Sequence, residues 1–155
     1  MSTYERTHRI EGIADVDDAV ERLVEFYRHN GYKVADRADD TVQFRRGRPR
    51  GGWFSSEMTQ LQTTVHAEPG DDTLSLEYTV DTSGQWLTDE DRQFWSREAE
   101  AAEACVNGAD PVDLRDDERQ RAGDVTSEIR RTGLQAMFII VILVVGVMLV
   151  AHLMG

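Results

Sequence analysis

One short stretch of the sequence, FRRGRPRGGWF over residues 44–54, concentrates positive charge. Its arginines are Arg45, Arg46, Arg48 and Arg50, and the aromatic residues Trp53 and Phe54 follow them directly. Guanidinium groups form paired hydrogen bonds with phosphate and carboxylate oxygens, and tryptophan favours the headgroup region of a bilayer. Glycine and proline within the stretch predict a loop. These residue types therefore indicate the binding of anions, with lipid headgroups among the candidates.

Three interpretations of this loop stay open. In the first, its arginines are solvated and pair with the carboxylates that the sequence has in excess. In the second, the loop contacts an anionic membrane surface, where each arginine contributes about 1 kcal/mol in moderate salt. In the third, the Arg/Gly segment follows nucleic-acid phosphates while an aromatic side chain stacks on a base. Nucleic acid is the least favoured partner, because the chain has a net charge of −12 and no second basic patch.

One histidine and one carboxylate could provide acid–base chemistry. His66 and Glu77 fall on the solvent-facing sides of two neighbouring predicted strands, where they could exchange a proton with a substrate. An exposed cross-strand pair explains the same spacing. The sequence has no glycine-rich phosphate loop, no G-x-S-x-G, no H-E-x-x-H and no histidines at metal-ligand spacing. We therefore expect no catalytic, cofactor-binding or metal-binding residues, with a membrane-tethered enzyme of unknown reaction as the alternative.

The elements that must position these residues follow from periodicity and capping signals. Alternating polar and apolar residues predict strands over 4–10, 32–37, 41–46, 59–67 and 74–80. One helix is predicted to begin after Asp15 as N-cap and to end at Gly31. A second is predicted to begin after Thr88 and to end at Asn107. The order β-α-β-β-β-β-α predicts an α+β domain, with both helices on one face of an antiparallel sheet of about five strands.

An apolar segment, residues 134–154, contains no Asp, Glu, Lys or Arg. At about 1.5 Å per residue, a helix of this length reaches about 30 Å, the thickness of a bilayer's hydrocarbon core. Arg130 and Arg131 precede the segment and no basic residue follows it, so the positive-inside rule places residues 1–131 in the cytoplasm. The polar N-terminus does not resemble a signal peptide. We therefore expect a tail-anchored, single-pass protein of the cell membrane, with the lipid bilayer as its partner.

Composition divides the chain into three parts: an acidic soluble domain over 1–108, a polar charged linker over 109–133 and a transmembrane helix over 134–154. The chain has 29 acidic and 17 basic residues, and Lys33 is the single lysine. This composition and layout resemble those of small membrane proteins of extreme halophiles that have no assigned function. A dense carboxylate surface would keep such a domain hydrated in concentrated salt. The resemblance implies no activity.

The remaining signals concern redox state and partners. Cys105 is the single cysteine, which excludes an intrachain disulfide and agrees with a reducing compartment. Gly146 is the only glycine inside the apolar segment, so no G-x-x-x-G motif supports a homo-oligomer, which is left open. The sequence thus predicts a non-enzymatic binding or scaffold domain held at a membrane. Its partners would be anionic lipid and an unidentified membrane or cytosolic protein.

Overall fold

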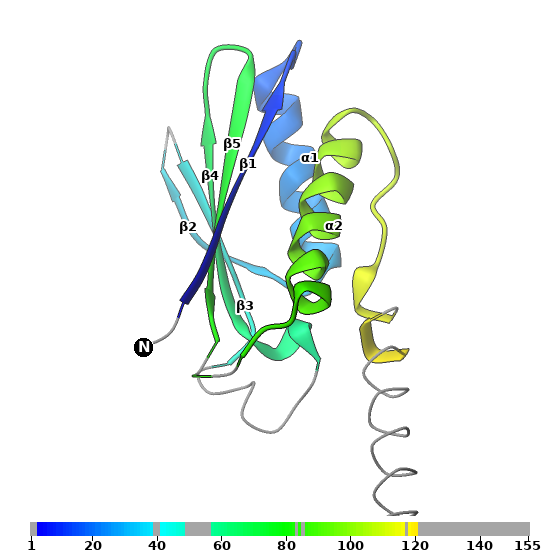
Figure 1. Cartoon of the computed structure of the whole chain (residues 1–155). Coiled ribbons are helices and arrows are strands. Elements are labelled where there is room, and N and C mark those ends of the chain that lie inside the picture. The colour runs from blue at the N-terminus through cyan, green and yellow to red at the C-terminus, as the bar shows by residue number, and fades with distance from the viewer. Residues whose placement is uncertain are drawn as a thin grey trace, which may run out of the picture. The chain divides into compact units, whose positions relative to one another are not determined.

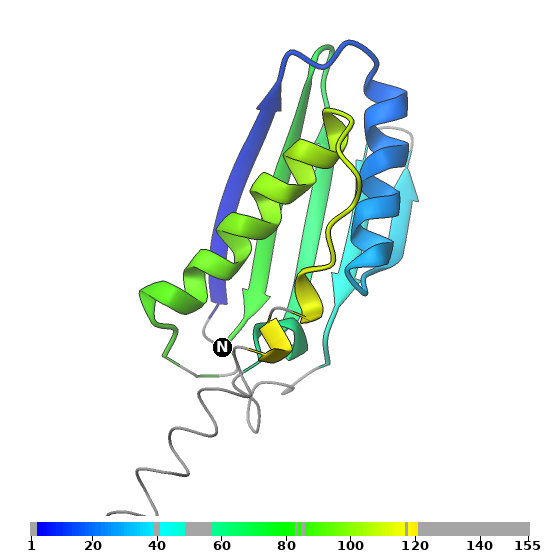
Figure 2. The ribbon, with the colours of Figure 1, turned by 90° about the vertical axis from the view of Figure 1, so that its right-hand side faces the viewer.

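The computed structural model describes residues 3–38, 41–48, 57–82, 84, 86–116 and 118–120. The elements are β1 (Thr3–Glu11), α1 (Val16–His29), β2 (Lys33–Ala38), β3 (Thr41–Arg46), the 3-10 helix η2 (Met58–Gln60), β4 (Gln62–Pro69), β5 (Thr73–Asp81) and α2 (Asp89–Val106). The strands form one five-stranded sheet, and both helices cover the same face of it (Figure 1, Figure 2). The predicted α+β class and element order are therefore confirmed.

The sheet has the strand order β1-β5-β4-β3-β2, and every neighbouring pair is antiparallel. Strands β2 and β3 form one hairpin and β4 and β5 another, while α1 carries the chain from the β1 edge to the β2 edge (Figure 1). Thr3 lies opposite Asp81, and Asp81 lies opposite Gln62. Arg46 lies opposite Thr63, next in the chain to Gln62. The start of β1 and the end of β3 therefore lie at the same end of the sheet.

Both helices begin and end where local sequence signals place them. The Asp15 carboxylate accepts a hydrogen bond from the Asp18 backbone N–H at 3.0 Å and so caps α1. Gly31, just beyond the end of α1, has a φ of 82°, which glycine adopts without steric cost. Thr88 and Asp91 form a reciprocal capping box at the start of α2. The predicted helix ends are therefore confirmed.

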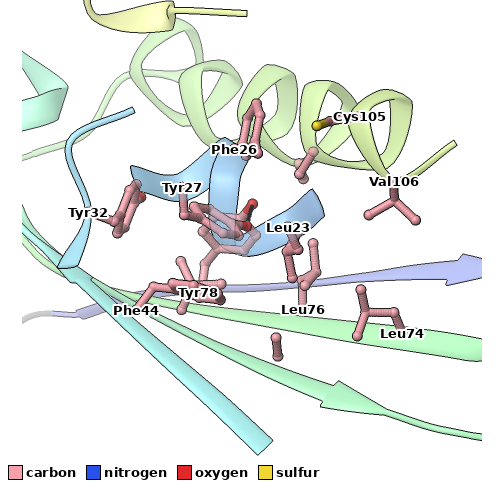
Figure 3. Close-up of a cluster of buried hydrophobic side chains, with 14 of the residues drawn as sticks. Leu23, Phe26, Tyr27, Tyr32, Phe44, Leu74, Leu76, Tyr78, Cys105 and Val106 are labelled. Atoms are coloured by element: carbon pink, nitrogen blue, oxygen red, sulfur yellow. Dashed lines mark hydrogen bonds between the residues drawn. The ribbon is translucent and has the colours of Figure 1, made fainter. Parts of the chain in front are cut away.

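The core lies between the helices and the sheet, and aromatic rings form its centre (Figure 3). Tyr27 packs against Phe44 and Tyr32, with ring centroids 4.6 and 4.9 Å apart. Its hydroxyl lies 2.5 Å from that of Tyr78, so these two buried polar groups satisfy each other. Cys105 is buried beside this cluster, as expected for a packing residue. Burial raises the pKa of the Cys105 thiol, which keeps it in its less reactive protonated form.

The fourth strand begins later than its alternation predicts. Met58–Gln60 form η2, and β4 starts at Gln62 rather than at Thr59. The predicted alternation itself is confirmed, because the inward-facing positions are all buried: Thr59, Leu61, Thr63, Val65 and Ala67. A single turn of 3-10 helix thus leads into the strand without changing which face points to the core.

The domain extends further along the chain than composition predicts. Its compact unit runs to Arg119, so the expected boundary at residue 108 is too early. The Asn30 side chain accepts a hydrogen bond from the Leu114 N–H at 2.9 Å and donates one to the Val112 carbonyl at 2.9 Å. The Glu118 carboxylate accepts a hydrogen bond from the Met58 N–H at 3.0 Å. We call residues 110–119, which are attached in this way, the strap.

Several predictions concern residues outside those that the structure describes. They involve Arg50, Trp53, Phe54, Arg130, Arg131 and the apolar segment 134–154. Within the described residues, no helix is both long enough and apolar enough to cross a bilayer.

Candidate functional site

A cleft of about 920 Å³ opens at the end of the sheet where β2 begins and β3 ends. Strands β2 and β3, helix η2 and the strap contribute its walls. Six of the described residues that line it are basic: Lys33, Arg45, Arg46, Arg48, Arg115 and Arg119. One is acidic, Glu57. The lining of the cleft therefore has an excess of basic residues, whereas the whole chain has a net charge of −12. We call this cleft the cationic cleft.

Lys33 and Arg45 form the sheet side of the cationic cleft. They are direct partners across the β2–β3 ladder, and both are exposed. Opposite residues of antiparallel strands have their Cβ atoms about 5 Å apart, and like charges placed there destabilise the pair. The sheet therefore retains a local repulsion that an anion bound between the two side chains would relieve.

Gly47 brings the chain from β3 into close contact with the segment that precedes β4. It has a φ of 81°, and a Cβ added to it would lie 2.2 Å from the Leu61 carbonyl oxygen. Only glycine can therefore occupy this position without moving the backbone. Arg48 then pairs with Leu61 as an isolated bridge, and its N–H donates to the Gln60 carbonyl at 3.4 Å. This contact places Arg48 in the wall of the cationic cleft.

The strap contributes Arg115 and Arg119 to the lining of the cleft. Asp113 holds the Arg115 guanidinium with two hydrogen bonds, of 3.0 Å from Nε and 2.7 Å from Nη2. The same guanidinium lowers the pKa of the Asp113 carboxyl to about 2. Arg119 pairs with Asp116 at 3.1 Å. Both strap arginines are thus partly neutralised by neighbouring carboxylates, and the two hydrogen bonds to Asp113 orient the Arg115 guanidinium.

Arg46 is buried, although the neighbouring arginines Arg45 and Arg48 face solvent. Its side chain is 4% exposed and forms an ion pair of 2.6 Å with Glu98, which is fully buried. The Tyr32 hydroxyl donates to the same carboxylate at 2.7 Å, and the guanidinium lies 4.2 Å from the centre of the Tyr32 ring. Strand alternation is the reason, because Arg46 shares the inward face of β3 with Phe44. The prediction that Arg46 contacts a membrane therefore needs correction.

The structure keeps only part of the predicted arginine group together. Arg45 and Arg48 are exposed and line the cationic cleft, whereas Arg50, Trp53 and Phe54 lie outside the described residues. Sequence reasoning missed Lys33 and the two strap arginines. A signal for Lys33 was present, because the predicted β2–β3 hairpin places it close to Arg45. Arg115 and Arg119 are four residues apart, which places them on one face of a helix. The sequence around them does not predict which part of the domain that face contacts.

His66 and Glu77 are direct cross-strand partners, so their predicted proximity is confirmed. Both are exposed and alternate along their strands with buried residues, so they lie on the face of the sheet that points away from the core. The Gln43 side-chain amide donates a hydrogen bond to His66 Nε2 at 2.9 Å. Neither residue is among those that line the cationic cleft. Across the described part of the chain, no group of three or more His, Cys, Asp or Glu side chains could hold a metal ion.

Comparisons with known proteins add little to this site. No family model and no curated protein matches the chain. One similar solved structure is the crystal structure of Ara h 8.0201, which is 13% identical in sequence and has a TM-score of 0.38. The match covers 69% of this chain and 95% of the other. A likeness this low assigns no function, so function must be argued from the chemistry of the cationic cleft.

Proposed function

We propose that the protein is a membrane-tethered, non-enzymatic binding domain whose cationic cleft holds the anionic lipid headgroups of its own bilayer. One observation carries this proposal: in a chain of net charge −12, five exposed or half-exposed basic residues and one acidic residue line a single cleft, in addition to buried Arg46. Guanidinium and ammonium groups are the usual protein donors to phosphate oxygens, and such charge-assisted hydrogen bonds are stronger than neutral ones.

The tether makes weak headgroup binding sufficient. The apolar segment 134–154 has the length and composition of a transmembrane helix. Residues 120–133 separate it from the compact unit, and a chain of that length extends to about 50 Å at most. A domain tethered so closely experiences a high effective concentration of headgroups. Binding then fixes how the domain stands on its membrane.

The strength of this contact depends on salt. Lys33, Arg45 and Arg48 are all exposed, and each contributes about 1 kcal/mol beside an anionic leaflet in moderate salt. Together they would favour the docked orientation by about 3 kcal/mol. In about 1 M salt the Debye length falls to about 3 Å, so only direct contacts inside the cleft would persist.

The headgroup contact is tested by sedimentation of residues 1–119 with lipid vesicles. We expect binding to phosphatidylglycerol-containing vesicles, little binding to pure phosphatidylcholine, and loss of binding in the double variant Arg45→Gln/Arg48→Gln. Arg46 must be left intact, because its removal would unpair buried Glu98. The double variant Arg9→Gln/Arg37→Gln removes the same charge from two exposed positions that do not line the cleft. Equal sedimentation of all three proteins would contradict the proposal.

The tether is tested separately on the full chain. We expect it to stay in the membrane pellet after an alkaline carbonate wash and to dissolve only in detergent. A chain without residues 134–154 should appear in the supernatant. Release of the full chain by carbonate would refute membrane insertion while leaving the cleft's chemistry open to the vesicle experiment.

A further inference from the structure

The basic residues of the cationic cleft differ in how their charges are balanced. Arg115 pairs with Asp113, and Arg119 pairs with Asp116. Within the described part of the chain, Lys33, Arg45 and Arg48 form no ion pair with a carboxylate. Three uncompensated positive charges therefore line one cleft, and two of them, Lys33 and Arg45, are cross-strand partners.

Arg115 adds an oriented donor to this group. Its Nε and Nη2 atoms are bonded to Asp113, which leaves Nη1 for a ligand. The side chain packs against Gly31, where an added Cβ would lie 3.4 Å from both Cδ and Nη1. A guanidinium that is already held in place loses little conformational entropy when it binds.

Two kinds of phosphate group would meet this arrangement differently. A phosphodiester carries one negative charge and two oxygens that are not esterified, so it can balance only one of the three uncompensated cations. A terminal phosphate on a monoester carries a charge of about −1.5 to −2 at neutral pH and presents three acceptor oxygens. Lys33 and Arg45 belong to neighbouring strands, Arg48 to the turn after β3, and Arg115 to the strap. A cleft lined by donors from several segments suits the group with more free oxygens.

We infer that the cationic cleft is a receptor for terminal phosphate groups, that is, phosphate monoesters, in preference to phosphodiesters. This inference rests on the proposed function, because it specifies which anionic group the cleft binds. The same group occurs in a lipid with a monoester headgroup, such as phosphatidic acid, and in soluble phosphate monoesters. The chemistry of recognition is the same for both sources.

The preference is tested with the full chain in phosphatidylcholine nanodiscs, titrated calorimetrically with glycerol 3-phosphate or dimethyl phosphate. We expect glycerol 3-phosphate to bind about tenfold more tightly than dimethyl phosphate, because the monoester can accept one further charge-assisted hydrogen bond. Lys33→Gln/Arg45→Gln should abolish monoester binding, and Arg115→Gln should weaken it. Arg9→Gln/Arg37→Gln should leave it unchanged. Because all of these side chains are at least partly exposed, the variants should fold, which circular dichroism would verify.

A second arm identifies the source of the phosphate group. Nanodiscs that contain phosphatidic acid or phosphatidylglycerol are prepared with equal surface charge, and the glycerol 3-phosphate titration is repeated. If glycerol 3-phosphate binds more weakly only in the phosphatidic acid discs, the lipid headgroup competes for the cleft, which supports the inference with lipid as the source. If glycerol 3-phosphate binds equally well in both kinds of disc, the inference is supported with a soluble phosphate monoester as the source. Equal affinity for the monoester and the diester, or no monoester binding, overturns the inference. The proposed function would still stand if anionic vesicles bind the domain through Arg45 and Arg48.

Discussion

Glu98→Gln should destabilise the domain severely, because it removes the charge that balances buried Arg46. The Glu98 carboxylate accepts hydrogen bonds from the Arg46 guanidinium at 2.6 Å and from the Tyr32 hydroxyl at 2.7 Å. Both members of the ion pair are withdrawn from solvent, with side chains 4% and 0% exposed. Glutamine has the same size and keeps one acceptor oxygen, so packing changes little. The substitution therefore isolates the loss of charge.

Breaking a buried ion pair from one side costs about 3–5 kcal/mol, because the remaining charge stays in the core without a counterion. We expect about 3 kcal/mol for Glu98→Gln, at the lower end because the amide oxygen can still accept one hydrogen bond. Domains of this size are stable by about 5–15 kcal/mol, so the loss is a large fraction of the total. Replacing both partners, as in Arg46→Met/Glu98→Leu, should recover much of the stability, since apolar residues of similar volume often substitute for a buried pair.

The assay is urea denaturation of residues 1–119, followed by the fluorescence of buried Trp95 and by circular dichroism. Glu100→Gln is the matched control, because Glu100 lies on the exposed side of α2 and should change stability by no more than about 0.5 kcal/mol. The deficit of Glu98→Gln should persist in about 1 M salt, since buried charges are screened little. A loss within the range of the control, or a double variant less stable than Glu98→Gln, would refute this view of the core.

Three further outcomes follow from the structure. Gly47→Ala should lower the free energy of unfolding by about 2 kcal/mol, because the added Cβ would collide with the Leu61 carbonyl. Gly84 has the same φ of 81° but open space around it, so Gly84→Ala should lower the free energy of unfolding by only about 1 kcal/mol in the same urea denaturation assay. Asp113→Asn should lower the free energy of unfolding by about 1 kcal/mol near neutral pH. In the unchanged domain this contribution is present above the unfolded-state pKa of 3.8 and is lost as the pH falls towards the folded-state pKa of about 2. The variant should therefore lose less stability than the unchanged domain over this pH range. Burial raises the pKa of the hydroxyls of Tyr27, Tyr32 and Tyr78 above the usual 10.0. Stability should therefore be complete below about pH 10 and fall above it, with the tyrosinate absorbance of these three side chains appearing only as the domain unfolds. Their ionisation in the folded domain would contradict this.

Local signals were sufficient to predict the order of the helices and strands, although not the 3-10 helix η2. Asp15 caps α1 and Thr88 caps α2 through hydrogen bonds within four residues along the chain, so their effect is visible in any short window. The strands were predictable because one face of the sheet packs on the helices and the other meets solvent, which imposes a period of two. These two kinds of pattern gave the element order and hence the α+β class.

The site depends on contacts between distant residues, which local patterns do not contain. Arg46 could have been assigned to the core from its alternation with Phe44, but its partner Glu98 lies 52 residues away. The strap was expected to be a solvated linker because its sequence is polar. It is held instead by Asn30, which bonds to Val112 and Leu114 across 82 and 84 residues. The cationic cleft combines residues from four separate segments of the chain, and so composition alone could locate only its arginine loop.

The proposed contact between the cationic cleft and lipid headgroups is tested most directly by photocrosslinking of the full chain in anionic nanodiscs. A benzophenone amino acid replaces exposed Gln60, which lines the cleft, and in a second protein it replaces exposed Glu11 at the far end of β1. We predict lipid adducts at position 60 but not at position 11, and their loss when Arg45 and Arg48 are changed to Gln. No adduct at position 60, or equal yields at both positions, would contradict the proposal.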